Sequence, residues 1–281
     1  MYVSVCVCVY VNYITRKEKT KPLFSCYNVT KLSEGRCIVM SDHIQELRDI
    51  IEKHDNIVFF GGAGVSTESG IPDFRSVDGL YHQQYDYPPE TILSHTFYRR
   101  NPEEFYRFYR NKMYYPDAKP NAAHLALAKL EAQGKLRAVI TQNIDGLHQA
   151  AGSKNVLELH GSTLRNYCED CGHFHTLEYI VKANGIPKCE KCGGPVKPDV
   201  VLYEEGLDEA TITKSIQHIR QCDVLIIGGT SLSVYPAAGL IDYFNGDKLV
   251  VINKAPTPKD TKADLLIQAP IGEVFRAIVA I

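Results

Sequence analysis

Apolar residues follow two different patterns along the chain, and each pattern predicts a different kind of element. Isoleucine and leucine recur at helical spacing over residues 44–51, and Ser41 or Asp42 can cap the start of that helix. Short, uninterrupted apolar runs instead predict strands that are buried on both faces. We expect such strands at 56–60, 136–141, 156–159, 223–227 and 248–252.

Segments with helical periodicity lie between most of these strands. They cover residues 102–113, 122–133, 208–221, 236–244 and 272–281. Buried strands that alternate with helices imply a parallel sheet with helices on both faces, since a parallel crossover is usually a helix. The fold class that we predict is therefore α/β, with a Rossmann-like parallel sheet.

Composition narrows the class of protein without identifying it. The 281 residues suffice for one large domain and a small one, and 44% hydrophobic residues are ordinary for a globular protein. A net charge of −2 gives no reason to expect direct binding to nucleic acid or to an anionic membrane.

Four of the nine cysteines form two closely spaced pairs. Their pattern is Cys168-x2-Cys171-x17-Cys189-x2-Cys192, which is typical of a zinc ribbon. Four thiolates complete the coordination of zinc, so we predict one structural ion with no position left for substrate. The alternative, disulfide bonds, requires an oxidising compartment, whereas intact thiolates favour the cytoplasm. We expect a small inserted zinc-ribbon domain at about 164–203.

A glycine-rich turn follows the first predicted strand. Gly62-Ala63-Gly64 supplies two glycines of a dinucleotide-binding fingerprint, but Thr67 stands where the third would be. A phosphate can bind where such a turn opens a helix, although a plain tight turn would have the same sequence. The acidic residue that usually binds the ribose is not obvious, and Asn253 could replace it. An ordinary dehydrogenase is therefore disfavoured.

Polar residues gather after two other predicted strands. Gln142, Asn143, Asp145 and His148 follow one strand, and His160, with a glycine after it, follows another. Open α/β sheets bind ligands outside the carboxyl ends of their strands. A lone histidine is usually structural, but the position of His160 beside the expected crevice makes it a candidate for catalysis.

These segments together resemble the sirtuin family, and in particular bacterial sirtuins that consist of the catalytic core alone. The match runs in order from about Ile44 to the C-terminus and includes both cysteine pairs. The other motifs that carry it are Gly62-Ala63-Gly64-Val65-Ser66, Gly70-Ile71-Pro72-Asp73-Phe74-Arg75-Ser76, Thr141-Gln142-Asn143-Ile144-Asp145-Gly146-Leu147-His148, Leu159-His160-Gly161, Gly229-Thr230-Ser231-Leu232 and Ile252-Asn253. The resemblance implies a catalytic domain over residues 40–281, with a helical and cofactor-loop insertion at about 72–121.

The resemblance implies an NAD-dependent protein-lysine deacetylase, which transfers the acetyl group of acetyl-lysine to ADP-ribose and releases nicotinamide. His160 would be the general base, since the pKa of an imidazole, about 6.5, suits that task at neutral pH. Asn143 would orient water or ribose hydroxyls, and loop 71–93 would close over the cofactor. The residues implied in NAD binding are Ala63, Thr67, Phe74, Arg75, Gln142, Ile144, Asp145, His160, Thr230, Ser231, Asn253 and Ile271.

The implied substrate is an acetyl-lysine protein or peptide, and we expect the enzyme to be a monomer. An extended peptide can pair by its backbone with an edge strand, and segments 200–202 and 233–235 fit that role by position. Family members that remove acidic acyl groups resemble one another in a Tyr-x-x-Arg pair. Here Tyr106 is followed at the third position by Tyr109, so we expect neutral acyl groups, chiefly acetyl.

Three other functions are open to the same residues. Mono-ADP-ribosyl transfer could use the same site, but the presence of both Asn143 and His160 favours deacylation. An NAD(P) oxidoreductase is disfavoured by the incomplete glycine fingerprint, and a non-catalytic zinc-ribbon adaptor by the polar residues of the crevice.

Residues 1–39 stand apart from this organisation. The apolar, tyrosine-rich stretch 1–15 is too short to span a bilayer, which takes about 20 apolar residues. It also lacks the charged segment and cleavage site of a signal peptide. A second methionine, Met40, precedes the first capped helix. We therefore expect residues 1–39 to be a disordered tail or a mis-assigned upstream extension.

Overall fold

The computed structural model describes residues 32–33, 36–37, 40–73 and 87–278 of the chain. The chain divides into two compact units, Met1–Val39 and Met40–Ile281. In the first unit, β1 (Leu32–Ser33) pairs antiparallel with β2 (Arg36–Cys37). Everything below concerns the second unit. Phe74, Arg75 and most of the expected loop 71–93 lie outside the described residues.

Six parallel strands form the central sheet of the described chain, in the order β11-β10-β9-β3-β4-β5. Their bounds are β3 Ile57–Gly61, β4 Leu136–Thr141, β5 Val156–Glu158, β9 Val224–Gly228, β10 Lys248–Ile252 and β11 Leu265–Ile267. The chain runs outward from β3 through β4 and β5, then returns to β9 on the other side of β3. This reversal is the switch point at which open α/β sheets bind ligands. The α/β prediction is confirmed, and only the short β11 was not predicted among these strands.

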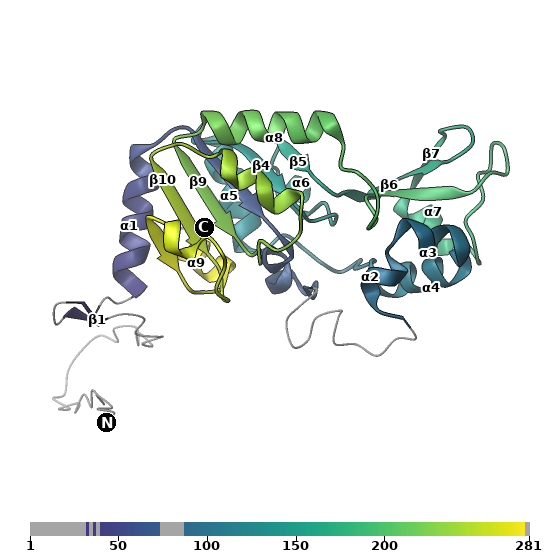
Figure 1. Ribbon diagram of the computed structural model, residues 1–281, viewed down its shortest axis with the longest axis horizontal. Coiled ribbons are helices and arrows are strands. Elements are labelled where there is room, and N and C mark those ends of the chain that lie inside the picture. The colour runs from purple at the N-terminus through teal and green to yellow at the C-terminus, as the bar shows by residue number, and fades with distance from the viewer. Residues whose placement is uncertain (1–31, 34–35, 38–39, 74–86, 279–281) are drawn as a thin grey trace, which may run out of the picture. The chain divides into compact units, whose positions relative to one another are not determined.

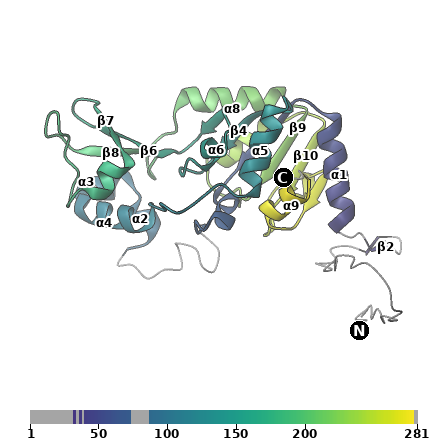
Figure 2. The same cartoon turned by 180° about the vertical axis from the view of Figure 1, so that it is seen from behind.

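Alternate residues of the strands enter two separate cores. Ile57 and Phe59 of β3 pack with α1 (Met40–Lys53), α5 (Ala122–Ala132) and α9 (Ile271–Ile278). Their neighbours Val58 and Phe60 pack with α8 (Glu209–Gln221) and the 3₁₀ helix η4 (Ala237–Tyr243) on the other face (Figures 1 and 2). All five residues of β3 are buried, as expected for a strand covered on both faces. Of the helices described, none combines the length and apolar character needed to cross a membrane.

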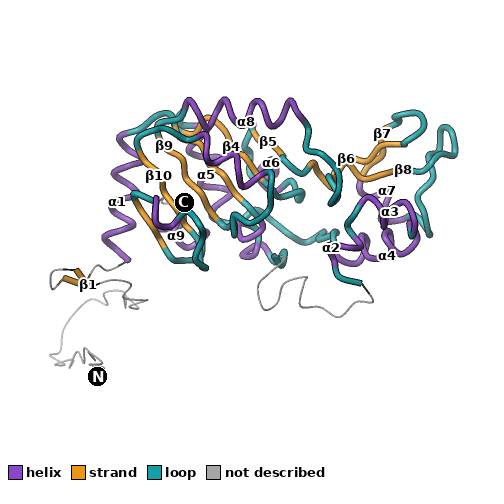
Figure 3. The backbone as a smooth tube through the Cα atoms, viewed as in Figure 1, coloured by secondary structure: helices purple, strands orange, loops and turns teal. Residues whose placement is uncertain are grey.

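A third core joins two insertions that are far apart in the sequence. One contains α2 (Pro89–Ile92), α3 (His95–Arg100) and α4 (Pro102–Lys112). The other contains a three-stranded antiparallel sheet, in the order β7-β6-β8, and one helix. Its elements are β6 Gly161–Cys168, β7 Phe174–Thr176, α7 Leu177–Lys182 and β8 Val196–Val200 (Figure 3). Aromatic residues of α3 and α4 pack against Ile180 and Val196, so the helical insertion and the cysteine-bearing sheet form one body.

The glycine-rich turn does not open a long helix, contrary to the prediction. It continues into two short 3₁₀ helices, η1 (Ala63–Val65) and η2 (Thr67–Ser69). The Thr67 hydroxyl donates to the Gly64 carbonyl at 3.0 Å, which competes with a regular helical ladder. Gly70, at a left-handed φ of 85°, then ends the second turn. The predicted helix 236–244 is likewise a 3₁₀ helix in the structure.

Candidate active site

Two glycine turns meet at the switch point of the sheet. One follows β3 and the other follows β9, and the Gly64 amide donates to the Gly229 carbonyl at 2.8 Å. A Cβ atom on Gly64 would lie 2.8 Å from the Cα atom of Gly229, and Gly229 itself has a φ of 58°. The glycines are therefore required for the two turns to touch, besides any contact with a ligand.

Four predicted cofactor residues lie on these two turns. Ala63 and Thr67 are half-buried, Thr230 is buried, and Ser231 is exposed. The Thr230 hydroxyl accepts a hydrogen bond from Gln142 Nε2 at 3.0 Å, which ties a third predicted segment to the turn after β9. Strand ends that are distant in sequence thus bring these residues to one edge of the sheet.

Asn253 and Ile271 lie at the β10–β11 end of the same edge. Asn253 Nδ2 donates to the Ala255 carbonyl at 2.7 Å. Ile271 is only 3% exposed, and it packs so closely on Gly228 that a Cβ atom there would lie 2.2 Å from its Cδ1. The Glu68 carboxylate accepts from the Gly272 amide at 2.6 Å and so links the first glycine turn to α9.

A hydrogen-bonded chain connects Asn143 to Asp145 through a serine that was not among the predicted site residues. Asn143 Nδ2 donates to Ser66 Oγ at 3.0 Å, and Ser66 Oγ donates to Asp145 Oδ2 at 2.6 Å. Ser66 is 1% exposed and lies on the glycine turn. Its presence in the glycine motif was the available signal, but the sequence does not show that the turn after β3 reaches the loop after β4. The arrangement leaves the Asn143 amide oxygen to accept from a ligand hydroxyl or water.

Ile144, between these two residues, is held by its backbone. Its carbonyl oxygen accepts from both the amide and the hydroxyl of Thr163, at 2.9 and 3.0 Å. Asp145 Oδ1 also accepts from the Leu147 amide at 2.9 Å. Thr163, on β6, is thus a second residue of the site that the sequence did not indicate, because it acts from the inserted sheet.

His160 is oriented by a contact with the neighbouring strand end. Its Nδ1 lies 2.9 Å from the Gln142 carbonyl oxygen. A carbonyl can only accept, so in the neutral ring Nδ1 carries the proton and Nε2 keeps its lone pair. Burial lowers the pKa of His160 below 6.5, and the Gln142 carbonyl opposes that effect. The ring is therefore a neutral base with Nε2 available to accept a proton.

His148 does not belong with the other polar residues of its motif. It is 1% exposed, and its ring lies 4.7 Å from that of His124 and 6.2 Å from that of Phe59. The short helix α6 (Leu147–Ala150) turns this side chain into the core behind the strand end. We expected His148 at the crevice because it follows Asp145 by three residues, and that expectation is wrong.

The backbone edge expected at 200–202 is already used within the chain. Val201 donates to the His160 carbonyl at 3.0 Å. The amide of Leu202 donates to Glu205 Oε2, and its carbonyl accepts from the Glu205 amide. The next residue, Tyr203, forms a parallel bridge with Ser94. A turn closed by Glu205 therefore occupies this edge, whereas Ser233 and Tyr235 of the other expected segment are exposed.

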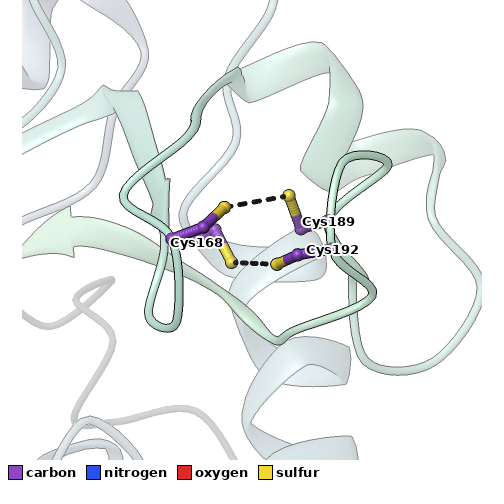
Figure 4. A group of neighbouring side chains, drawn as sticks. Cys168, Cys189 and Cys192 are labelled. Atoms are coloured by element: carbon purple, nitrogen blue, oxygen red, sulfur yellow. Dashed lines mark hydrogen bonds between the residues drawn. The ribbon is translucent and has the colours of Figure 1, made fainter.

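The four paired cysteines come together at the far end of β6 from His160. All four Sγ atoms lie within 4.8 Å of one another, and Figure 4 shows sulfurs pointing toward a common centre. The separations are 3.4 Å for Cys168–Cys192 and 3.7 Å for Cys171–Cys189. Zn–S bonds of about 2.3 Å in a tetrahedron require sulfurs about 3.8 Å apart, so this group fits zinc. Gly172 and Gly193, at φ 68° and 78°, turn the backbone after each pair.

Comparison with known proteins identifies the family to which this arrangement belongs. Residues 62–236 match the Sir2 family. An NAD-dependent protein deacetylase of Clostridium acetobutylicum is 60% identical over 245 residues, covering 86% of this chain and all of the relative. The corresponding protein of Clostridium perfringens is also 60% identical, covering 85% of this chain and all of the relative.

Solved structures that are similar to this chain are also described as Sir2 proteins. A structure described as "Sir2-p53 peptide-NAD+" is 39% identical with a TM-score of 0.75, and covers 84% of this chain and 96% of its own. Another, described as "Structural Basis for the Mechanism and Regulation of Sir2 Enzymes", is 43% identical with a TM-score of 0.77, and covers 85% and 97%.

Proposed function

This chain belongs to the Sir2 family, and on that premise we propose that it is an NAD-dependent protein-lysine deacetylase. With the consumption of one water, it transfers the acetyl group of acetyl-lysine to ADP-ribose and releases nicotinamide and free lysine. The observation that carries the proposal is the contact of His160 Nδ1 with the Gln142 carbonyl, beside the Asn143–Ser66–Asp145 chain. These residues place a neutral base and a polar cluster at the switch point of a dinucleotide-type sheet.

We propose that His160 is the general base, acting through Nε2. Once the acyl oxygen has attacked the ribose carbon from which nicotinamide leaves, a ribose hydroxyl must lose its proton to attack the acyl carbon. A neutral imidazole at the edge of the sheet can accept that proton. Asn143 would orient the ribose hydroxyls or water through its amide oxygen.

NAD would lie across the two glycine turns. Ala63, Thr67, Thr230 and Ser231 would hold the phosphates and the nearby ribose through turn amides and hydroxyls. Asp145 and the backbone of Ile144 would hold the nicotinamide amide, and Gln142 the neighbouring ribose. Asn253 and Ile271 would lie toward the adenine end, and Phe74 and Arg75 belong to the same proposal. Compact unit Met40–Ile281 is the proposed catalytic unit.

Zinc would have a structural role only. Cys168, Cys171, Cys189 and Cys192 can supply four thiolates, which leaves no coordination position for a substrate. The zinc site therefore holds the antiparallel sheet together, and no chemical step is assigned to it.

An acetyl-lysine peptide is the proposed partner, since related Sir2 structures are described with p53 peptide. We propose segment 233–235 as the edge that pairs with such a peptide, since Ser233 and Tyr235 are exposed. The Val234 carbonyl accepts from the Ala238 amide at 2.9 Å, while in segment 200–202 both the amide and the carbonyl of Leu202 bond to Glu205. A cytoplasmic location is supported by the four thiols, which persist as zinc ligands under reducing conditions. A monomer is part of the same proposal.

The experiment is nicotinamide release from NAD, measured with and without an acetyl-lysine peptide. We expect release only with the peptide, and a loss of at least about 100-fold in His160→Ala. Zinc content and melting temperature should stay at wild-type values, and His43→Ala on α1 should retain activity. Release without peptide would instead indicate a glycohydrolase, and labelled ADP-ribose on protein would indicate ADP-ribosyl transfer.

A further inference from the structure

An irregularity in β6 lies directly after the proposed catalytic base. Gly161 and Ser162 pair with Val200 and Asp199 of β8, but the next pair is Asn166 with Pro198. Residues 163–165 therefore have no partner on β8 and form a bulge. Bulges commonly re-aim side chains next to functional sites, and this one does so beside His160.

All three residues of the bulge reach back to the site. Thr163 holds the Ile144 carbonyl through two hydrogen bonds. Leu164 lies on Gly146, where a Cβ atom would be 2.5 Å from its Cδ1. The third residue, Arg165, reaches the two strands on either side of His160.

Arg165 bridges two carboxylates. Its Nη1 donates to Glu158 Oε2 at 2.6 Å, and its Nε donates to Asp199 Oδ2 at 2.7 Å. The Glu158 side chain is only 8% exposed, and its other oxygen accepts from Gln149 Nε2 at 2.8 Å. The planar guanidinium suits such a bridge because its donors point in fixed directions, which an ammonium cannot reproduce.

The two carboxylates flank the backbone of His160. Glu158 ends β5 two residues before His160. Asp199 lies two residues before Val201, whose amide donates to the His160 carbonyl at 3.0 Å. Gly161, at φ 74°, is pressed against the same strand, and a Cβ atom there would be 2.0 Å from the Asp199 carbonyl oxygen. Arg165 thus links β5, which ends two residues before His160, to β8, which lies just before the Val201 amide that binds the His160 carbonyl.

We propose that Arg165 is a positioning residue for His160: by bridging Glu158 and Asp199, it fixes the backbone from which the imidazole reaches the Gln142 carbonyl. This inference rests on the proposed function. The Arg165 bridge differs from a surface ion pair such as Arg107–Glu104. In that pair the arginine is 64% exposed and its partner lies on the same helix. Removal of Arg165 leaves the buried Glu158 carboxylate without its cation, which is costlier than loss of an exposed pair.

The test compares Arg165→Met, Arg165→Lys and the double variant Glu158→Gln/Arg165→Met, with Arg107→Met as the matched control. We expect Arg165→Met to lower kcat for acetyl-peptide at least tenfold while KM for NAD changes less than threefold. Zinc content should remain one ion per chain. Arg165→Lys should recover activity only in part, because it cannot bridge both carboxylates. The double variant should remain impaired in kcat, because it removes the unpaired buried charge without restoring the bridge between the two strands, and Arg107→Met should match wild type. Recovery of wild-type kcat in the double variant would overturn the positioning role.

A spectroscopic measurement separates this proposal from the proposed function. The ¹H–¹⁵N spectrum of the imidazoles should show the Nδ1–H tautomer of His160 in wild type and a changed signal in Arg165→Met. Wild-type kcat in Arg165→Met, or an unchanged His160 signal, would overturn the positioning role. Wild-type protein that releases no nicotinamide would overturn the deacetylase function instead, while the His160 signal would still test the role of Arg165.

Discussion

His160 Nδ1 lies 2.9 Å from the backbone carbonyl oxygen of Gln142, so a backbone atom rather than a carboxylate orients the ring. The contact selects the tautomer in which Nε2 is the acceptor. Because the partner is a backbone atom, the orientation of the ring depends on the relative position of the ends of β4 and β5. Parallel pairing fixes that position, with Thr141 in register with Glu158.

The pH dependence of activity should follow from the buried environment of His160. Burial lowers the pKa of this imidazole, so the neutral, active form persists to a pH below 6.5. As pH falls through the lowered pKa, the ring is protonated and activity should be lost. We expect the acid limb of kcat/KM for the peptide to have its midpoint below pH 6.5. A midpoint above pH 7 would contradict this assignment.

Acid should also destabilise the fold through His124 and His148. Burial is the main cause that lowers the pKa of His124 to about 4 and that of His148 to about 3. Both are neutral when folded, so their contribution is complete above pH 6.5 and decreases as pH falls toward these values. As pH falls below 6.5, uptake of a proton by each of these histidines on unfolding should lower the free energy of unfolding by about 1.4 kcal/mol per pH unit. Urea unfolding at pH 7 and pH 5 measures the slope, which His148→Phe should reduce; an unchanged slope would contradict the prediction.

Removal of zinc should abolish activity by loosening one part of the molecule. The cysteines Cys168 and Cys189 belong to the same core as α3 and α4. Without the metal the β6–β8 sheet loses its cross-link, and Thr163 no longer holds Ile144. Chelation or Cys171→Ser should therefore abolish nicotinamide release and lower the melting temperature, and Cys222→Ala should keep its zinc. Full activity in metal-free protein would refute the structural role.

Gly64→Ala should separate the two glycine turns. The added methyl group would lie 2.8 Å from both Cα and the carbonyl oxygen of Gly229. We expect a loss of about 1–3 kcal/mol in unfolding free energy, together with weaker NAD binding by calorimetry. Gly206→Ala is the control, because a Cβ atom there meets no atom of the described residues within 4 Å. Equal NAD affinity in Gly64→Ala and wild type would show that the turns bind no cofactor.

Acetyl groups should be removed faster than succinyl groups. Tyr106 and Tyr109 of α4 are fully buried, and the Tyr106 hydroxyl donates to the Val196 carbonyl at 2.5 Å. Arg110 Nε donates to the Ile180 carbonyl at 3.0 Å, so this cation is engaged in holding α7. We expect at least a tenfold preference in kcat/KM for an acetyl over a succinyl peptide of the same sequence. A faster reaction with the succinyl peptide would refute it.

The sequence by itself determined most strands of the central sheet and the four cysteines of the metal site. Continuous apolar runs such as 57–60 can only be stable when both faces are covered, which leads to the parallel α/β class. The spacing of the cysteine pairs is local, and the side chains converge as the sequence pattern indicated. His160 is also marked locally, because it follows a predicted strand and precedes a glycine.

Only the tertiary structure decided which strand ends meet. Ser66 joins Asn143 to Asp145 because β3 and β4 are neighbours, and Gly64 touches Gly229 because the strand order reverses between β3 and β9. His148 enters the core although its sequence neighbours line the edge. Arg165 acquires its contacts from a bulge whose register depends on pairing with β8. These relationships arise from contacts between distant segments, and local periodicity contains no information about them.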